Sequence, residues 1–151
     1  MSTLRELEDS YSRRGALQKK YQKELVKLES EADRIRGEIE SVQHQLDDIE
    51  SDNQKVKAKI ASYLKSGDIQ VIEVMYHHLE ESSLKTEQLK ESKLNLEDAL
   101  FNCVELIKKV QLSHRKNGDR NQKLERKIVT KADLKRIEEA TLILTNRKRE
   151  S

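Results

Sequence analysis

The sequence predicts an all-α protein, an antiparallel two-helix coiled-coil hairpin with a longer C-terminal arm. Three observations predict it: the composition, a long heptad pattern, and one break near the middle of the chain. The 151 residues include no proline and only 4 glycines, and 38% of them are charged. Ala, Glu, Lys, Leu and Arg make up about half the chain, which is typical of coiled coils and long helices. Barrels and sandwiches are excluded because they need more turn residues and aromatics.

The first arm, predicted over residues 2–65, carries apolar residues at spacings that alternate between three and four from Leu4 to Tyr63. Fifteen of the eighteen positions in this stripe are apolar. A sustained heptad repeat of this kind specifies a left-handed coiled coil, because the 3.5-residue period must stay on one helix face. Asn53 falls in the stripe, where it costs stability and can fix the register. Arg14 and Gln18 predict weaker packing in the first heptads.

The turn is predicted at residues 66–68. Gly67 can take the left-handed conformation that ends a helix, and Asp68 can cap the next one. A second arm follows over 69–148, and nine of the twelve stripe positions between Ile72 and Val110 are apolar. Two antiparallel arms would pair residues whose numbers add up to about 134. One continuous helix in a parallel dimer stays open, because an interior glycine costs only about 1 kcal/mol.

The second arm is longer than the first, and the facing geometry predicts that the first arm ends opposite residue 130. There the run from Thr130 to Asp133 resembles a capping box with Asp in place of Glu. Residues 113–123, which contain Gly118 and no apolar residue, are either a solvated helix or a hinge. Beyond them lies a short unpaired apolar stripe: Leu134, Ile137, Ala140 or Thr141, and Leu144. Short isolated helices are marginal in water, so the stripe favours a protein partner, with fraying as the alternative.

The net charge of +2 is unevenly distributed. Residues 1–36 carry +2 and 98–151 carry +6, whereas 37–54 carry −6, 55–65 carry +4 and 66–97 carry −4. If the chain folds back at its middle, its two ends form one basic tip. Such a tip favours an acidic partner through an attraction that salt weakens. A solvated surface with chance clustering is the alternative.

The sequence contains no apolar run of membrane-spanning length, so no direct membrane insertion is expected. The first residues lack a secretory signal, and the single Cys103 indicates a reducing intracellular compartment. Four scattered histidines, together with the lack of a Gly-rich phosphate loop, predict no enzyme activity, no catalytic residues, no cofactor and no metal. No nucleic acid is expected, because no basic region precedes the heptads and stacking aromatics are rare. Cys103 is expected to be a small buried apolar residue.

Two segments carry more apolar residues than one helix stripe needs. Nine of the fourteen residues from Ala99 to Leu112 are apolar. Since a two-helix pair buries only a narrow stripe, Phe101 and Val104 are expected to be partly exposed as a docking patch. A thicker core against the first arm is the alternative. The second segment follows the turn and contains Val71, Ile72, Val74, Met75, Tyr76 and Leu79.

A hairpin that turns before mid-chain, a Tyr-x-x-Leu element at Tyr76–Leu79 and a longer basic C-terminal arm resemble the FliJ/YscO family of type III secretion stalk proteins. The resemblance spans nearly the whole chain. The chain lacks the tryptophans common in flagellar members, which favours the injectisome branch, a virulence system.

The resemblance implies a cytoplasmic stalk at the inner face of a membrane-embedded export apparatus. Its partners would be a hexameric secretion ATPase, an export-gate protein and export chaperones. The resemblance places an ATPase contact set at Leu4, Leu7, Tyr11, Arg13, Arg14, Ile137, Leu144, Arg147 and Lys148. It places an export-gate contact set at Tyr76, Leu79, Ser83 and Thr86. The alternative function is a structural scaffold or tether that homodimerises through its heptads.

Overall fold

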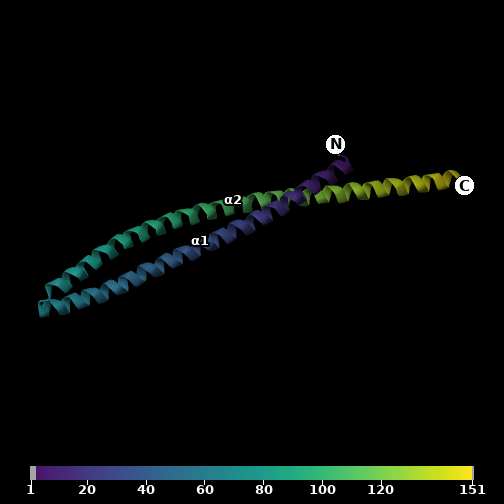
Figure 1. Ribbon diagram of the computed structural model, residues 1–151. Coiled ribbons are helices and arrows are strands. Elements are labelled where there is room, and N and C mark those ends of the chain that lie inside the picture. The colour runs from purple at the N-terminus through teal and green to yellow at the C-terminus, as the bar shows by residue number, and fades with distance from the viewer. Residues whose placement is uncertain (1–2, 151) are drawn as a thin grey trace. The chain divides into compact units, whose positions relative to one another are not determined.

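The computed structural model describes residues 3–150, and side chains as far as residue 149. It consists of two helices, α1 (Leu4–Ser66) and α2 (Ile69–Glu150), and the described residues contain no strand (Figure 1). The two long helices pack against each other, which confirms the all-α helical hairpin. The observed bounds lie within two residues of the predicted arms, although the predicted start at Ser2 lies outside the described residues.

The hairpin divides into two compact units, and each helix contributes to both. The turn unit comprises residues 28–106, and the terminal unit comprises residues 1–27 together with 107–151. Within each unit the α1 and α2 segments run side by side (Figure 1).

The turn forms as the sequence predicts. Gly67 has a φ of +75°, and its N–H donates a hydrogen bond of 3.0 Å to the Tyr63 carbonyl. The Ser66 hydroxyl donates to the same carbonyl at 2.9 Å, so the end of α1 is satisfied locally. Asp68 caps α2, because its Oδ1 accepts a bond of 3.4 Å from the Val71 N–H.

The start of α1 has a cap that the sequence analysis missed. The Thr3 hydroxyl oxygen accepts a hydrogen bond of 3.2 Å from the N–H of Glu6. The Thr3 carbonyl accepts another, of 3.1 Å, from Leu7. The Thr-x-x-Glu spacing of a capping box was therefore visible in the sequence.

The turn unit buries a narrow apolar seam whose best-covered residues are Ala32, Ile35, Ile60, Ile72 and Cys103. Its pairing follows the predicted register. The Cys103 thiol donates to the Leu28 carbonyl at 3.3 Å, and Lys93 Nζ donates to Gln43 Oε1 at 2.8 Å. The residue numbers in these pairs sum to 131 and 136, close to the expected 134. The buried position of Cys103 is confirmed.

On the outer surface of the turn unit, ion pairs form between residues of the same helix. The Arg34 guanidinium pairs with both Glu31 and Glu38 on α1. Its hydrogen bond and its charge hold the pKa of the Glu31 carboxyl below the usual value. Exposed pairs of this kind contribute little to stability, so the hairpin depends on the seam.

The terminal unit continues the seam through the segment that the sequence left ambiguous. Residues 113–123 are helical, and the side chains that continue the 3–4 spacing of the seam are polar in this segment. From this segment onward, the buried or half-buried seam positions of α2 are His114, Asn117, Asn121, Leu124, Ile128 and Lys131. The segment is therefore a continuous part of α2 whose seam-facing side chains are polar.

The capping box predicted at Thr130 is wrong. The Thr130 hydroxyl donates 2.9 Å back to the Arg126 carbonyl, and α2 runs through this point without a break. A threonine inside a helix makes this bond to the residue four positions earlier, so nothing here starts a new helix. Burial ends at Ala132, and every side chain from 133 to 149 is exposed. This agrees with the prediction that the first arm ends opposite residue 130.

Replacing Gly67 with alanine is expected to lower the free energy of unfolding by about 1–2 kcal/mol, because a Cβ is strained at this positive φ. Gly37→Ala is the matched control. Gly37 lies inside α1 with open space around its Cβ position, so alanine should raise stability by about 1 kcal/mol. Urea unfolding followed by circular dichroism measures both changes. Equal effects of the two substitutions would contradict the assignment of the turn.

Candidate functional site

The terminal unit is held in register by a polar layer, defined as Arg14, Gln18 and Asn117. Asn117 is 4% exposed. Its amide nitrogen donates 2.9 Å bonds to the Arg14 carbonyl and to Gln18 Oε1, and its Oδ1 accepts a 3.2 Å bond from the Arg14 guanidinium. Three bonds between α1 and α2 therefore converge on one buried side chain.

The two helices approach closely at the polar layer. A Cβ on Gly118 would lie 2.9 Å from the Gln18 side-chain nitrogen, so glycine leaves room for that amide. The flanking seam positions are less well satisfied. His114 Nε2 and Asn121 Oδ1 are buried and have no hydrogen-bond partner. These two unpartnered groups cost stability, while the hydrogen bonds of the polar layer fix how the helices align.

A basic groove lies beside the polar layer, between α1 and α2. It measures about 250 Å³ and is lined by Ser10, Arg14, Arg120, Lys123, Leu124 and Lys127. An adjoining hollow on α1 adds Arg13, and no carboxylate lines either one. The terminal unit holds 21 Lys and Arg against 10 Asp and Glu, whereas the turn unit holds 9 against 18. Charge is thus segregated between the units more strongly than the sequence segments suggested.

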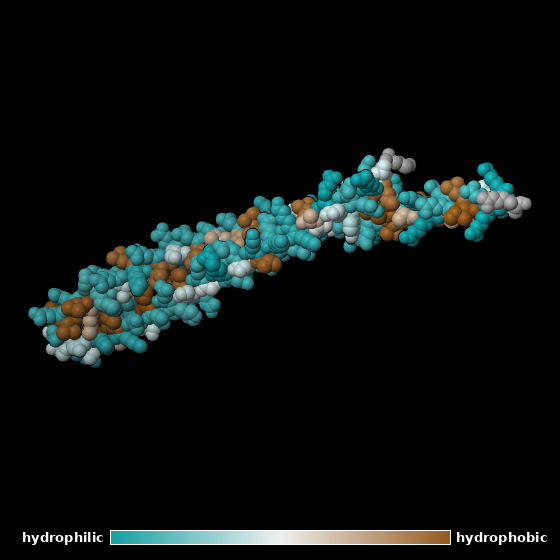
Figure 2. Space-filling model, turned by 45° about the vertical axis from the view of Figure 1, so that its right-hand side comes forward, coloured by the Kyte–Doolittle hydropathy of each residue, from teal (hydrophilic) through white to brown (hydrophobic). Residues whose placement is uncertain are grey.

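The overhang is defined as residues 133–149 of α2, and all of its side chains are exposed. At the observed register no described residue of α1 lies opposite it, because α1 begins at Leu4. Its largest apolar side chains are between 53% and 63% exposed: Leu134, Ile137, Leu142, Ile143 and Leu144. Apolar side chains also appear on the surface near the C-terminal end of α2 in Figure 2. Helices of this length gain most of their stability from packing, so the overhang is suited to binding another protein.

The terminal unit contains all nine residues of the ATPase contact set. Leu4 is half-buried and Leu7 is buried in the seam, while Arg14 is half-buried in the polar layer. The exposed members are Tyr11, Arg13, Ile137, Leu144, Arg147 and Lys148. Six of the nine side chains are therefore exposed, and three lie in the seam or the polar layer.

The export-gate contact set lies in the turn unit and is divided between surface and seam. Tyr76 and Ser83 are exposed. Leu79 and Thr86 are half-buried, and the Thr86 hydroxyl donates 2.8 Å to the Ser82 carbonyl of its own helix. Exposed apolar residues near the turn include two that the sequence analysis left out, Leu64 and Ile69.

The docking patch predicted after Ala99 is exposed as expected. Phe101 is 64% exposed and Val104 is half-buried, while Cys103 between them faces the seam. The alternative of a thicker core does not describe Phe101. A large aromatic on the outer face of α2 adds contact area for a partner at little cost in entropy.

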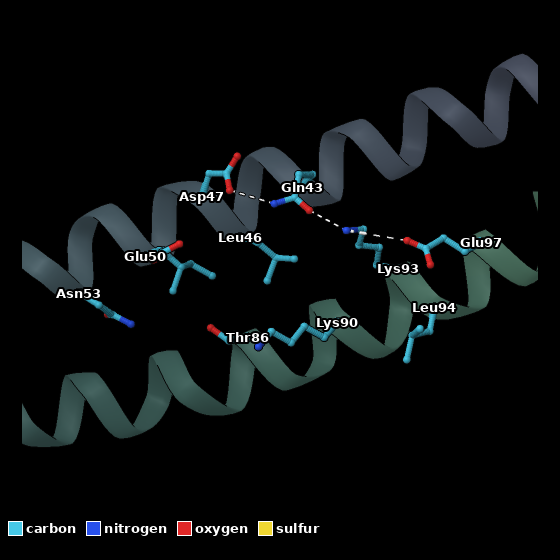
Figure 3. Close-up of a pocket in the computed structure, with 11 residues that line it drawn as sticks. Gln43, Leu46, Asp47, Glu50, Asn53, Thr86, Lys90, Lys93, Leu94 and Glu97 are labelled. Atoms are coloured by element: carbon cyan, nitrogen blue, oxygen red, sulfur yellow. Dashed lines mark hydrogen bonds and ion pairs between the residues drawn. The ribbon is translucent and has the colours of Figure 1, made fainter.

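A second groove, about 660 Å³, lies in the turn unit where polar residues interrupt the seam (Figure 3). Lys93 bridges Gln43 at 2.8 Å and Glu97 at 3.8 Å, and Gln43 donates 2.9 Å to Asp47. At the other end of the groove, Asn53 Oδ1 is buried without a hydrogen-bond partner. The groove is open, and Lys93, one of its two lysines, is paired with Glu97, so the groove is a polar break in the seam.

No family model matches the chain, and neither a curated protein nor a solved structure matches it. Among the described residues, no group of three His, Cys, Asp or Glu is placed to hold a metal ion. None of the described helices has a stretch long and apolar enough to cross a membrane.

Proposed function

We propose that this chain is the non-enzymatic central stalk of a type III secretion system, of the FliJ/YscO kind. In this role the terminal unit binds a hexameric secretion ATPase. The observation that carries the proposal is the overhang: seventeen helical residues with every side chain exposed, on the most basic part of the molecule.

The pore of a hexameric ring is a partner that matches this geometry. A single helix with apolar and basic side chains around its circumference can contact several subunits at once. The hairpin behind it stays aligned because the polar layer fixes α1 against α2. Neither helix contains proline, so no helical hydrogen bond is removed along a shaft that transmits position or force.

The turn unit has the opposite charge and carries the remaining proposed contacts. Tyr76 and Ser83 lie on its surface and are available to an export-gate protein. Phe101 is available to an export chaperone. The stalk would therefore work at the inner face of a membrane-embedded export apparatus, with its two units engaging different partners.

The test is a mixture of the purified chain with a hexameric secretion ATPase. The stalk proposal expects a complex with fewer chains than ATPase subunits, and faster ATP hydrolysis. Arg13→Glu with Arg147→Glu should weaken both, because both side chains are exposed on the terminal unit. The matched control, Lys55→Glu with Lys85→Glu, makes the same charge change in the turn unit. No complex at low salt and unchanged hydrolysis would refute the proposal.

A homodimeric scaffold or tether is the second candidate, and the exposure of Phe101 favours it. The sequence predicted that such a tether homodimerises through its heptads, but α1 and α2 pack against each other within one chain. Self-association through the Phe101 patch would instead cover an aromatic side chain that the hairpin leaves in water. Sedimentation distinguishes the two functions. The stalk predicts an elongated monomer, and the tether predicts an obligate dimer that Phe101→Ser dissociates.

A further inference from the structure

Along one face of α2, the exposed side chains are mostly basic in the first half and mostly apolar in the second half. We call it the docking face and define it by residues spaced alternately four and three apart: Lys116, Arg120, Lys123, Lys127, Thr130, Leu134, Ile137, Thr141 and Leu144. This spacing keeps side chains on one side of a helix. All nine are exposed, and all nine belong to the terminal unit.

The docking face borders the seam. Its first five residues each precede a seam residue by one position, as Lys116 precedes Asn117 and Lys127 precedes Ile128. A step of one residue turns about 100° around the helix, which places this face beside the groove between α1 and α2. Arg120, Lys123 and Lys127 line that groove. A helix laid along the face would therefore contact both helices over its basic half.

The basic half of the docking face contains four cations and no carboxylate, and one carboxylate, Asp119, borders it three residues after Lys116 and four before Lys123. The residues of α2 between Lys116 and Leu144 that bear a negative charge all lie off the face: Asp119, Glu125, Asp133, Glu138 and Glu139. No carboxylate of α1 lines the groove either. The positive charge on this side is thus available to a ligand, and it falls in a single row.

The apolar half of the docking face is also exposed. Leu134, Ile137 and Leu144 are between 54% and 60% exposed. The Thr141 hydroxyl donates 2.8 Å to the Ile137 carbonyl, so its polar group is satisfied within the helix. No described residue of α1 covers this row, because α1 begins at Leu4, which lies opposite residue 130. Apolar residues at 3–4 spacing are the pattern that a second helix packs against.

We infer that the docking face binds one amphipathic acidic helix of another protein as a third helix. Its acidic half would lie along Lys116–Lys127, and its apolar half would pack on Leu134–Leu144. The face is about 42 Å long, which corresponds to a helix of some 28 residues. A second copy of this chain is a poorer match, because its corresponding face carries the same positive charge. The inference rests on the docking face and on the groove between α1 and α2, and it does not require a secretion ATPase. Ile137 and Leu144 also belong to the ATPase contact set, so the two partners would compete for the overhang.

The probe is a synthetic helical peptide of about 28 residues with glutamates spaced 3–4 in one half and leucines so spaced in the other. It is made in both orders, because the direction of the partner is open. Fluorescence anisotropy measures its binding to the full chain at about 50 mM and 300 mM salt. We expect one order to bind, and we expect salt to weaken it. Failure of both orders at low salt would overturn the inference.

Two pairs of variants locate the binding. Lys116→Glu, Arg120→Glu and Lys123→Glu together should weaken it about tenfold or more. The matched control is Lys19→Glu, Arg115→Glu and Arg126→Glu, which makes the same charge change on exposed positions of the terminal unit off the face. Ile137→Gln with Leu144→Gln should also weaken it about tenfold, and Leu142→Gln with Ile143→Gln should change it little.

Each other outcome counts against the inference. Equal loss in the charge variant and its control means a diffuse polyanion surface. Loss in the charge variant alone, with no effect of Ile137→Gln and Leu144→Gln, means that no helix packs on the apolar half. Dimers of the chain that these same variants dissociate would make a second copy the occupant. Circular dichroism checks that each variant keeps its helices.

Discussion

Exchanging Arg14, Gln18 and Asn117 together for leucine is expected to raise the free energy of unfolding by about 2–4 kcal/mol. Asn117→Leu alone is expected to lower it by about 1–3 kcal/mol. The two changes have opposite signs because the layer is a closed set of hydrogen bonds. Removing Asn117 leaves half-buried Arg14 and Gln18 without these hydrogen bonds. Removing all three replaces polar groups by side chains that fit the apolar seam.

The gain in stability should come with a loss of alignment. Asn117 bonds two residues of α1 one turn apart, and this geometry exists in one register only. With leucine at all three positions, apolar contacts alone select the register, and shifted or dimeric arrangements become competitive. Sedimentation and a pair of spin labels on Leu17 and Gln111 would detect them.

The control for the polar layer is Arg13→Leu, Lys20→Leu and Lys116→Leu. These side chains are exposed on the same unit, so stability should change by no more than about 0.5 kcal/mol per site. A triple layer variant that unfolds more readily than the wild-type chain would contradict this account. It would mean that the layer contributes net stability as well as alignment.

The fold could be predicted from the sequence because the signals that define the two helices and the turn are local. Heptad spacing, one glycine and one aspartate were enough to place the turn and the register, since each acts through its own backbone or helix face. The prediction failed at Thr130, because the same residue pattern occurs both at the start of a helix and inside one. The deciding factor is whether the preceding helix stops, and nothing before Thr130 stops α2.

The polar layer was missed for a different reason. The apolar stripe of the second arm stopped at Val110, so residues 113–123 were interpreted as a solvated helix or a hinge. The continued 3–4 spacing of His114, Asn117 and Asn121 was the signal that could have found the layer, read together with Arg14 and Gln18 opposite. Surface sites are less predictable still, because Leu79 and Thr86 sit in the seam where the resemblance implied contact with a partner.

Deleting residues 133–151 is expected to leave the hairpin as stable as before and to abolish binding to the ATPase. No described side chain beyond Ala132 is buried, so the free energy of unfolding should change by less than about 0.5 kcal/mol. Urea unfolding measures this. The proposed stalk inserts the overhang into the ring, so stimulation of hydrolysis should disappear with it.

The deletion separates shape from charge, because it removes five basic and four acidic residues and so changes the net charge by one. Loss of binding after the deletion would therefore reflect lost contacts of the helix, since the remaining terminal unit keeps most of its positive charge. The charge variants Arg13→Glu and Arg147→Glu test the contribution of positive charge to ATPase binding. A truncated chain that still binds and stimulates the ATPase would assign the contact to the basic groove. A truncated chain that loses its helical structure would show that the overhang stabilises the hairpin, against the burial pattern.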